Sequence, residues 1–223
     1  KPLLPVEGRP IVDYIMDKLD DIAEIDEVYV VTNNRFYKNF EEWAAKHESR
    51  KKITVINDKT LTNEERLGAV GDIQLVLEEV KIKEDLLIIA GDNLFAFKMQ
   101  NFLEFARAHA PGCSIVLHNI GSREEAKKYG VVAIDDANKL LSFAEKPVEP
   151  KSTLVAICLY YFPAEKLALV EKYLNQSKHK DAPGNYIDWL VRNDEVFGFI
   201  FEGKWYDIGD KDIYEEIKDT YKG

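Results

Sequence analysis

The sequence has few of the features that mark a secreted or membrane-spanning protein. Only Cys113 and Cys158 among its 223 residues are cysteines, and both lie in apolar runs, which predicts buried thiols in a reducing compartment rather than a disulfide. No run approaches the roughly 18 uninterrupted apolar residues that a membrane helix needs. No signal peptide is recognisable at the first residues. These absences lead us to expect a globular protein of the cytoplasm without a membrane partner.

Positive charge is also scarce. Lysine and arginine total 30 against 40 aspartate and glutamate residues, a formal net charge of −10. Because nucleic-acid backbones are bound mainly through clustered lysine and arginine, this balance argues against a nucleic-acid partner. A small anionic ligand remains compatible with it, provided that local cations, backbone amides or a bridging metal ion meet the ligand's charge. The four histidines show no metal-ligand spacing, which argues against zinc.

What the sequence does contain is an alternation of strand-length apolar runs and helical patterns, typical of an α/β sheet with helices on its faces. After residue 123 the strands follow one another without helical crossovers, which predicts antiparallel pairing in a second lobe. No linker or repeat divides the chain, so we expect one domain over residues 1–223. We expect strands at 27–32, 52–57, 85–91, 113–119, 131–135, 139–145, 153–162, 196–202 and 204–208, and helices at 9–23, 37–48, 67–80, 98–110, 165–175, 185–193 and 211–222.

The stretch "LLIIAGDNLF" contains the first candidate for a chemical role. Within the expected strand 85–91, the residues from Leu86 onward are apolar at consecutive positions, which favours an interior strand of a largely parallel sheet. Ligands in such sheets bind outside the carboxyl ends of the strands, where Asp92 stands. The alternative is that Asp92 only caps a helix or forms a turn.

A second stretch, "KWYDIGD", has the same form, with Asp207 after Trp205 and Tyr206 at the end of a strand. Two strand-end carboxylates from distant parts of a chain are a common way to hold Mg²⁺, which prefers oxygen ligands and keeps waters and phosphate oxygens for its other positions. We therefore predict that Asp92 and Asp207 converge on one magnesium ion.

Three further stretches suggest contacts with substrates. Glu145 and Lys146 are adjacent at a strand end, where the glutamate suits ligand hydroxyls and the lysine suits an anion, although a solvated pair at a sheet edge would look the same. Gly130 would let a ligand approach the backbone closely, or would simply form a turn. Gly68 opens a helix whose amides could face a base or a phosphate, and Asn185 stands at a helix start, where capping is the alternative.

Read together and in order, six motifs resemble those of the sugar-phosphate nucleotidylyltransferases and look most like the glucose-1-phosphate thymidylyltransferase group. Each motif alone is short, but together they cover the chain from end to end. The motifs are Lys1-Pro2-Leu3-Leu4-Pro5-Val6, Leu67-Gly68-Ala69-Val70-Gly71, Gly91-Asp92-Asn93, Tyr129-Gly130-Val131, Glu145-Lys146-Pro147 and Trp205-Tyr206-Asp207-Ile208-Gly209.

The resemblance implies a fold and a reaction. The fold is a doubly wound, mostly parallel, Rossmann-like nucleotidyltransferase sheet with helices on both faces and a smaller antiparallel sugar-binding lobe. In the reaction, a sugar 1-phosphate attacks the α-phosphorus of a nucleoside triphosphate, here guessed to be dTTP or UTP, and yields an NDP-sugar and pyrophosphate. Because such transfers depend mainly on positioning and charge neutralisation, they suit a sequence without a nucleophile–base motif.

The resemblance also implies roles for individual residues. Asp92 and Asp207 would hold Mg²⁺ as the cofactor, Lys1 would neutralise phosphate charge and Lys146 would contact the sugar phosphate. These four are the expected catalytic residues. The expected substrate-binding residues are Gly68 near the base, Gly130 under the sugar, Glu145 and Asn185 at the sugar hydroxyls, and Asn93 and Trp205 beside the aspartates.

Three departures from the family pattern leave the substrates open. The family's Gly-x-Gly-Thr-Arg phosphate loop would lie before Lys1, so we expect a strand and loop of on the order of 20 residues upstream. Ala69 and Val70 stand where the family usually has threonine and a small residue, and Ile157-Cys158 replace a Thr-Gly pair. Cytidylyl or guanylyl transfer, a phosphorylated alcohol as acceptor, and an inactive nucleotide-sugar-binding regulatory domain therefore remain alternatives, and a homo-oligomer is left open.

Overall fold

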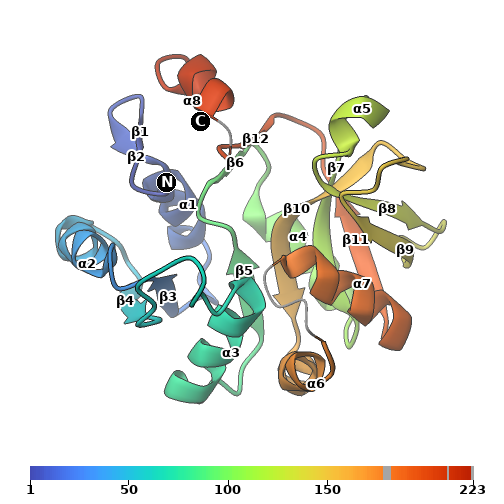
Figure 1. The fold of residues 1–223 in the computed structure, drawn as a ribbon, viewed down its shortest axis with the longest axis horizontal. Helices are drawn as coiled ribbons and strands as arrows, with labels where there is room; N and C mark the ends of the chain where they lie inside the picture. The colour runs from blue at the N-terminus through green and yellow to red at the C-terminus, as the bar shows by residue number, and fades with distance from the viewer. Residues whose placement is uncertain (178–181, 210, 222–223) are drawn as a thin grey trace. The chain divides into compact units, whose positions relative to one another are not determined.

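The computed structural model describes residues 1–177, 182–209 and 211–221, which form two compact units (Figure 1). The first unit comprises Lys1–Leu67, Gly91–Met99 and Gly203–Gly223, and the second comprises Gly68–Ala90 and Gln100–Glu202. Each unit is therefore built from segments that are far apart in the sequence. Helices and strands alternate along the chain, which confirms the α/β class.

The first unit contains one βαβ crossover and two short antiparallel strand pairs. The strands β3 and β4 are parallel and in register from Glu27 opposite Lys52 to Thr32 opposite Asn57. Helix α2 connects them and buries Phe40 and Trp43, which are three positions apart and so share one helical face. The elements are β1 (Pro5–Val6), β2 (Arg9–Pro10), α1 (Ile11–Asp20), β3 (Glu27–Thr32), α2 (Tyr37–Lys46), β4 (Lys52–Asn57), β6 (Asn93–Phe95), β12 (Trp205–Asp207) and α8 (Lys211–Ile217).

The second unit is built on a sheet in the order β11-β7-β10-β8-β9, with β5 paired to β10. Strand β10 is the longest strand of this sheet and pairs antiparallel with β5, β7 and β8, whereas β7 and β11 are parallel. The elements are α3 (Ala69–Val80), β5 (Leu86–Ile89), α4 (Met99–Ala108), β7 (Cys113–Asn119), α5 (Arg123–Ala126), β8 (Gly130–Ile134), β9 (Leu140–Glu145), β10 (Leu154–Phe162), the 3-10 turn η1 (Ala164–Lys166), α6 (Ala168–Gln176), α7 (Pro183–Asn193) and β11 (Val196–Ile200).

One pairing direction differs from what the sequence suggested. The sequence predicts an interior strand of a parallel sheet at 85–91, but among the described residues β5 pairs with β10 alone, antiparallel, and all four of its residues are half-buried. An apolar run carries no information on strand direction. The antiparallel pairing predicted for β8, β9 and β10 is confirmed, yet these strands continue the sheet of β7 and β11.

Some helix bounds also differ from expectation. The helix expected at 9–23 begins at Ile11, because Arg9 and Pro10 pair with β1. The helix expected at 165–175 is a 3-10 turn followed by α6. The helix expected at 211–222 ends at Ile217, and position 222 lies outside the described residues. No helix in the described part of the chain combines the length and apolar character that crossing a membrane requires.

Each unit has its own apolar core. The core of the second unit is formed where β7 and β10 face α7, with Ile115, Leu117, Phe162, Ile187 and Leu190 almost fully buried. Burial of such a side chain contributes about 1.5–3 kcal/mol. The core of the first unit joins the N-terminal segment, β6 and the C-terminal helix through Val6, Ile11, Leu94, Ile208 and Ile217.

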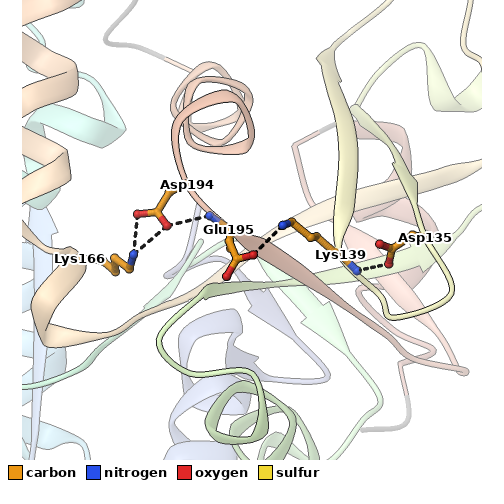
Figure 2. A network of polar contacts seen from close by, with 5 residues as sticks. All are labelled: Asp135, Lys139, Lys166, Asp194 and Glu195. Atoms are coloured by element: carbon orange, nitrogen blue, oxygen red, sulfur yellow. Dashed lines mark hydrogen bonds and ion pairs between the residues drawn. The ribbon is translucent and has the colours of Figure 1, made fainter.

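The turn between β8 and β9 is anchored to the beginning of β11 by a polar network (Figure 2). The ammonium of Lys139 lies 2.6 Å from Glu195, and the backbone amide of Lys139 donates to Asp135 at 2.8 Å. Gly198 N also donates to the carbonyl of Asn138 at 2.8 Å. Asp194, the neighbour of Glu195, accepts from Lys166 through both oxygens at 2.7 Å. The network fixes one end of β9, whose other end is Glu145.

The two cysteines differ in exposure. Cys113 is buried in β7, as expected, whereas Cys158 in β10 is only half-buried, so the expectation of two buried thiols is wrong for Cys158. Burial raises the pKa of the Cys113 thiol to about 12.

We therefore predict that Cys113 resists alkylation in the folded protein. With a pKa of about 12, only about one Cys113 in 10,000 is a thiolate at pH 8, and the thiolate is the nucleophile. Iodoacetamide labelling followed by mass spectrometry should modify Cys113 only after unfolding in guanidinium. Labelling of Cys113 in the native protein at its unfolded-state rate would contradict the placement of this side chain.

Candidate functional site

The residues singled out from the sequence fall into two groups, one in each unit. Lys1, Asp92, Asn93, Trp205 and Asp207 lie in the first unit and are called here the aspartate cluster. Gly130, Glu145, Lys146 and Asn185 lie in the second unit and are called the glutamate cluster, and Gly68 lies in the second unit at the start of α3.

The structure brings Asp92 and Asp207 together through the short antiparallel pair of β6 and β12. In this ladder Asp207 is directly opposite Asn93, and Ile208 N donates to the carbonyl of Asp92 at 2.9 Å. The ladder continues at its other end, where Ala96 N donates to the carbonyl of Lys204 at 3.0 Å. Two carboxylate-bearing residues from distant parts of the chain are thereby held on neighbouring backbone segments.

The side chain of Asn93 links Asp92 to Trp205. Its side chain is only 5% exposed, its amide nitrogen donates to Asp92 Oδ1 at 3.2 Å, and its oxygen accepts from the indole N–H of Trp205 at 2.7 Å. The side chains of Asn93 and Trp205 therefore form a chain of hydrogen bonds that orients the Asp92 carboxylate. Their direct contact with substrate stays a prediction.

Asp207 and Lys1 meet at Gly209. The amide of Gly209 donates to Asp207 Oδ1 at 2.9 Å, and its carbonyl accepts from the ammonium of Lys1 at 2.8 Å. A Cβ atom on Gly209 would lie 3.0 Å from the same carboxylate oxygen, so the glycine permits this tight turn. The residues next to Lys1 and Asp92 also lie close together, because a Cβ atom on Gly91 would lie 3.0 Å from the side chain of Pro2.

Tyrosines that the sequence did not single out hold the segment that follows Lys1. The hydroxyl of Tyr214 donates to the carbonyl of Pro5 and that of Tyr14 to the carbonyl of Val6, both at 2.9 Å. The ring of Tyr221 meets the rings of Tyr14 and Tyr206 edge to face. A tyrosine bonded to a distant backbone carbonyl leaves no local pattern, so no signal in the sequence could have identified these residues.

The aspartate cluster fits a magnesium ion by its donor chemistry. Both carboxylates are half-buried and are oriented by hydrogen bonds to one oxygen each. Mg²⁺ is commonly held by one or two carboxylates, with waters and substrate phosphates completing its octahedron. Within residues 1–177, 182–209 and 211–221, no group of three or more His, Cys, Asp or Glu side chains could hold a metal, so a cage made only of protein ligands does not form there.

The glutamate cluster is assembled by the pairing of β8 with β9 and by the start of α7. Gly130 lies opposite Glu145 in the ladder, and Lys146 N donates to the carbonyl of Tyr129 at 3.1 Å. Asn185 lies in the first turn of α7, next to Gly184, which contacts the Glu145 carboxylate. The structure therefore brings Gly130, Glu145, Lys146 and Asn185 into one neighbourhood.

Gly130 has a packing reason in addition to its predicted role. A Cβ atom at this position would overlap the ring of Phe143, which is buried in the core of the second unit. The ring of Phe143 therefore occupies the space that a side chain at position 130 would need. Contact of Gly130 with a sugar stays a prediction.

Electrostatics distinguish the two charged residues of this cluster. Burial raises the pKa of Glu145, and the neighbouring Lys146 opposes this rise. Lys146 itself is exposed and has a left-handed backbone with φ of 45°. For a residue other than glycine, this backbone conformation costs roughly 1–2 kcal/mol. Backbone strain of this kind is found preferentially at functional sites.

Positive φ angles also occur at Gly68 and Cys158, two positions that the sequence analysis singled out. Gly68 precedes α3 with φ of 77°, which suits glycine, and accepts the hydrogen bond of Asp72 N at 2.9 Å. Cys158 has φ of 53° at the point where the register of β10 against β7 shifts, and its carbonyl accepts from Ala90 N at 3.0 Å. At the position where the resemblance expects glycine, a glycine-like backbone therefore persists with a cysteine side chain.

The chain is similar to several known proteins. The family model described as nucleotidyl transferase matches residues 1–222. The chain is 25% identical over 209 residues to the "Bifunctional protein GlmU" of Methanocaldococcus jannaschii, covering 94% of this chain and 46% of that protein. It is 27% identical over 128 residues to the "Glucose-1-phosphate adenylyltransferase" of Thermosipho africanus, covering 56% of this chain and 31% of that protein.

A solved structure shares the fold. The "Putative Glucose-1-Phosphate Thymidylyltransferase" of Bacillus anthracis superposes with a TM-score of 0.76 at 19% identity, covering all of this chain and 88% of that one. The chain spans between about a third and a half of the length of the two curated relatives named above. Because the family model matches nearly the whole sequence, the chain belongs to the nucleotidyl transferase family.

Proposed function

We propose that the chain catalyses the magnesium-dependent transfer of a nucleotidyl group from a nucleoside triphosphate to a sugar 1-phosphate. The observation that carries this proposal is the β6–β12 ladder, which places Asp92 and Asp207 on neighbouring backbone segments. Family membership supports the reaction type. dTTP or UTP is the proposed nucleotide, and cytidylyl or guanylyl transfer or a phosphorylated alcohol acceptor is the alternative.

In the proposed reaction, a phosphate oxygen of the acceptor forms a bond to the α-phosphorus of the triphosphate. The bond between this phosphorus and the oxygen that bridges to the β-phosphate breaks, and pyrophosphate leaves with its electron pair. No residue of the chain has to act as a nucleophile. Its contribution is to position the reactants and to stabilise charge, which is the main source of catalysis in transfers of this type.

The residues of the aspartate cluster divide this work. Asp92 and Asp207 would hold the magnesium ion, which when bound supplies positive charge to the phosphates. Asn93 and Trp205 keep the carboxylate of Asp92 in one orientation, and Gly209 does the same for Asp207. Lys1 brings a cation beside this turn.

The residues of the glutamate cluster are assigned to the acceptor. Glu145 and Asn185 would accept hydrogen bonds from sugar hydroxyls, Gly130 would lie beneath the sugar, and Lys146 would pair with the phosphate. Gly68, at the start of α3, is assigned to the base.

The proposed function is tested by measuring pyrophosphate release with each of ATP, GTP, CTP, UTP and dTTP against a panel of sugar 1-phosphates and phosphorylated alcohols. Release that requires both an acceptor and Mg²⁺ and that stops on addition of EDTA would support it. Binding of nucleotide without turnover for every pair, indifferent to Mg²⁺, would contradict it and favour a regulatory domain.

We predict that Asp92→Asn leaves the fold intact and lowers kcat at least about a hundredfold, on the order of 3 kcal/mol of lost charge stabilisation. Asp17→Asn is the matched control, because Asp17 pairs with Arg9 on the surface of the same unit. The measurement is kcat together with the melting temperature of both variants. A rate near that of the wild type in Asp92→Asn would remove the metal role.

The support of Asp92 by Asn93 makes a separate prediction. Trp205→Phe keeps a ring but removes the donor to Asn93, leaving a buried oxygen unsatisfied at a cost of about 1–3 kcal/mol. Because Asp92 would lose its fixed orientation, we expect the Mg²⁺ concentration for half-maximal turnover to rise about tenfold. An unchanged Mg²⁺ requirement with a raised substrate KM would assign Trp205 to substrate contact alone.

We also predict that Glu145→Ala mainly raises the KM for the acceptor. Its carboxylate is assigned to the sugar hydroxyls, so the KM for the nucleoside triphosphate should change by less than about threefold. Steady-state kinetics with each substrate varied in turn measures both values. An effect confined to the triphosphate would reverse the assignment of this cluster.

A further inference from the structure

The carboxylate of Glu145 rests directly on the first turn of α7. A Cβ atom on Gly184 would overlap Glu145 Oε2 and would lie 2.8 Å from Glu145 Cδ. The backbone of Gly184 is not left-handed, and glycine within a helix is about 1 kcal/mol less favourable than alanine. Neither backbone conformation nor helix propensity therefore explains glycine at position 184, whereas the space taken by Glu145 does.

Among the residues that the structure describes, the first turn of helix α7 has no negative group of its own. The residue before the helix is Ala182, whose methyl side chain cannot accept a hydrogen bond, and its first turn from Pro183 to Tyr186 contains no acidic residue. The carboxylate that lies against this turn belongs to Glu145, at the end of β9.

A second glycine and an aromatic ring complete the support. Phe143 lies two residues before Glu145 and so on the same face of β9. Its ring occupies the position that a Cβ atom on Gly130 would take. The same ring lies 3.1 Å from the position of a Cβ atom on Gly184. Phe143 is 6% exposed, so the ring is a fixed wedge between β8 and α7. The position of Glu145 is thus set by a buried ring on one side and a bare helix turn on the other.

We propose that Gly184 is a positioning residue that acts through Glu145. The absence of a side chain at Gly184 lets the Glu145 carboxylate dock on α7, and this docking fixes the orientation in which Glu145 accepts the acceptor's hydroxyls. The inference rests on the proposed function of Glu145. It goes beyond that function by naming what holds the carboxylate in place.

The kinetic test is a double-mutant cycle. Gly184→Ala should raise the acceptor KM about tenfold, which corresponds to about 1.4 kcal/mol, and leave the triphosphate KM within about twofold. In a Glu145→Ala background the same substitution should change the acceptor KM by less than about twofold, because the residue through which it acts is gone. Equal effects in both backgrounds, or an unchanged acceptor KM in the single variant, would overturn the proposal.

Gly198→Ala is the matched control. Gly198 lies on β11 in the same unit, and a Cβ atom there would press on Leu117 in the core without touching Glu145. It should lower the melting temperature and leave the acceptor KM unchanged. If Gly184→Ala does not fold, Gly184→Ala with Glu145→Ala should restore soluble protein by removing the overlapping carboxylate, and failure of this rescue would overturn the proposal.

A second test does not depend on activity. Burial raises the pKa of Glu145 above its usual value, with Lys146 opposing this rise. Among the described residues, Tyr160 also interacts electrostatically with Glu145. Ionisation of Glu145 therefore opposes folding once the pH exceeds the usual glutamate pKa, and this opposition is complete above the raised value. Glu145→Gln should accordingly gain melting temperature over the wild type as the pH rises from 4 to 7.

The two tests separate failure of the inference from failure of the proposed function. In the Gly184→Ala background the carboxylate is displaced toward solvent, so the pH-dependent gain from Glu145→Gln should shrink by at least about half. An undiminished gain would overturn the positioning role even if the enzyme is active. Should no substrate pair give turnover, the proposed function fails, and the pH-dependent melting still decides whether Gly184 positions Glu145.

Discussion

The short antiparallel ladder between β6 and β12 is the constraint on which the aspartate cluster depends. Two carboxylates brought close together repel each other, so something other than their own interaction has to hold them. The ladder does so through backbone hydrogen bonds, and Leu94 and Ile208 anchor it in the core of the first unit. Burial of those two side chains contributes about 1.5–3 kcal/mol each, which stabilises the ladder independently of any bound ion.

In each of the two clusters, the charged residues are positioned by neighbours that the proposed chemistry does not itself require. Asn93 and Trp205 orient Asp92, and the turn at Gly209 joins Asp207 to Lys1. In the second unit, left-handed backbones at Lys146 and Cys158 lie near or within the strands that form the glutamate cluster. Strain of this kind persists only where the surrounding structure over-determines it. Lys146 N is held by the carbonyl of Tyr129, and the carbonyl of Cys158 accepts from Ala90 N.

The two aspartates could be predicted from the sequence, because apolar residues give way to Asp92 after β5 and to Asp207 at the end of β12. The burial that the first run suggested is only partial, since all four residues of β5 are half-buried. The direction of β5 could not be predicted, since its apolar run is the same beside a parallel or an antiparallel partner. Gly184 and the tyrosines at positions 14 and 214 were missed for another reason. Their partners are a distant carboxylate and distant backbone carbonyls, which no local spacing encodes.

The central claim is that Asp92 and Asp207 act together on one divalent cation. A double-mutant cycle on kcat, using Asp92→Asn, Asp207→Asn and the double variant at saturating Mg²⁺, tests it most directly. If the two carboxylates share one ion, either substitution removes the same stabilisation, so the double variant should be little slower than the slower single variant. Losses that multiply fully in the double variant would show two independent roles and would contradict the account.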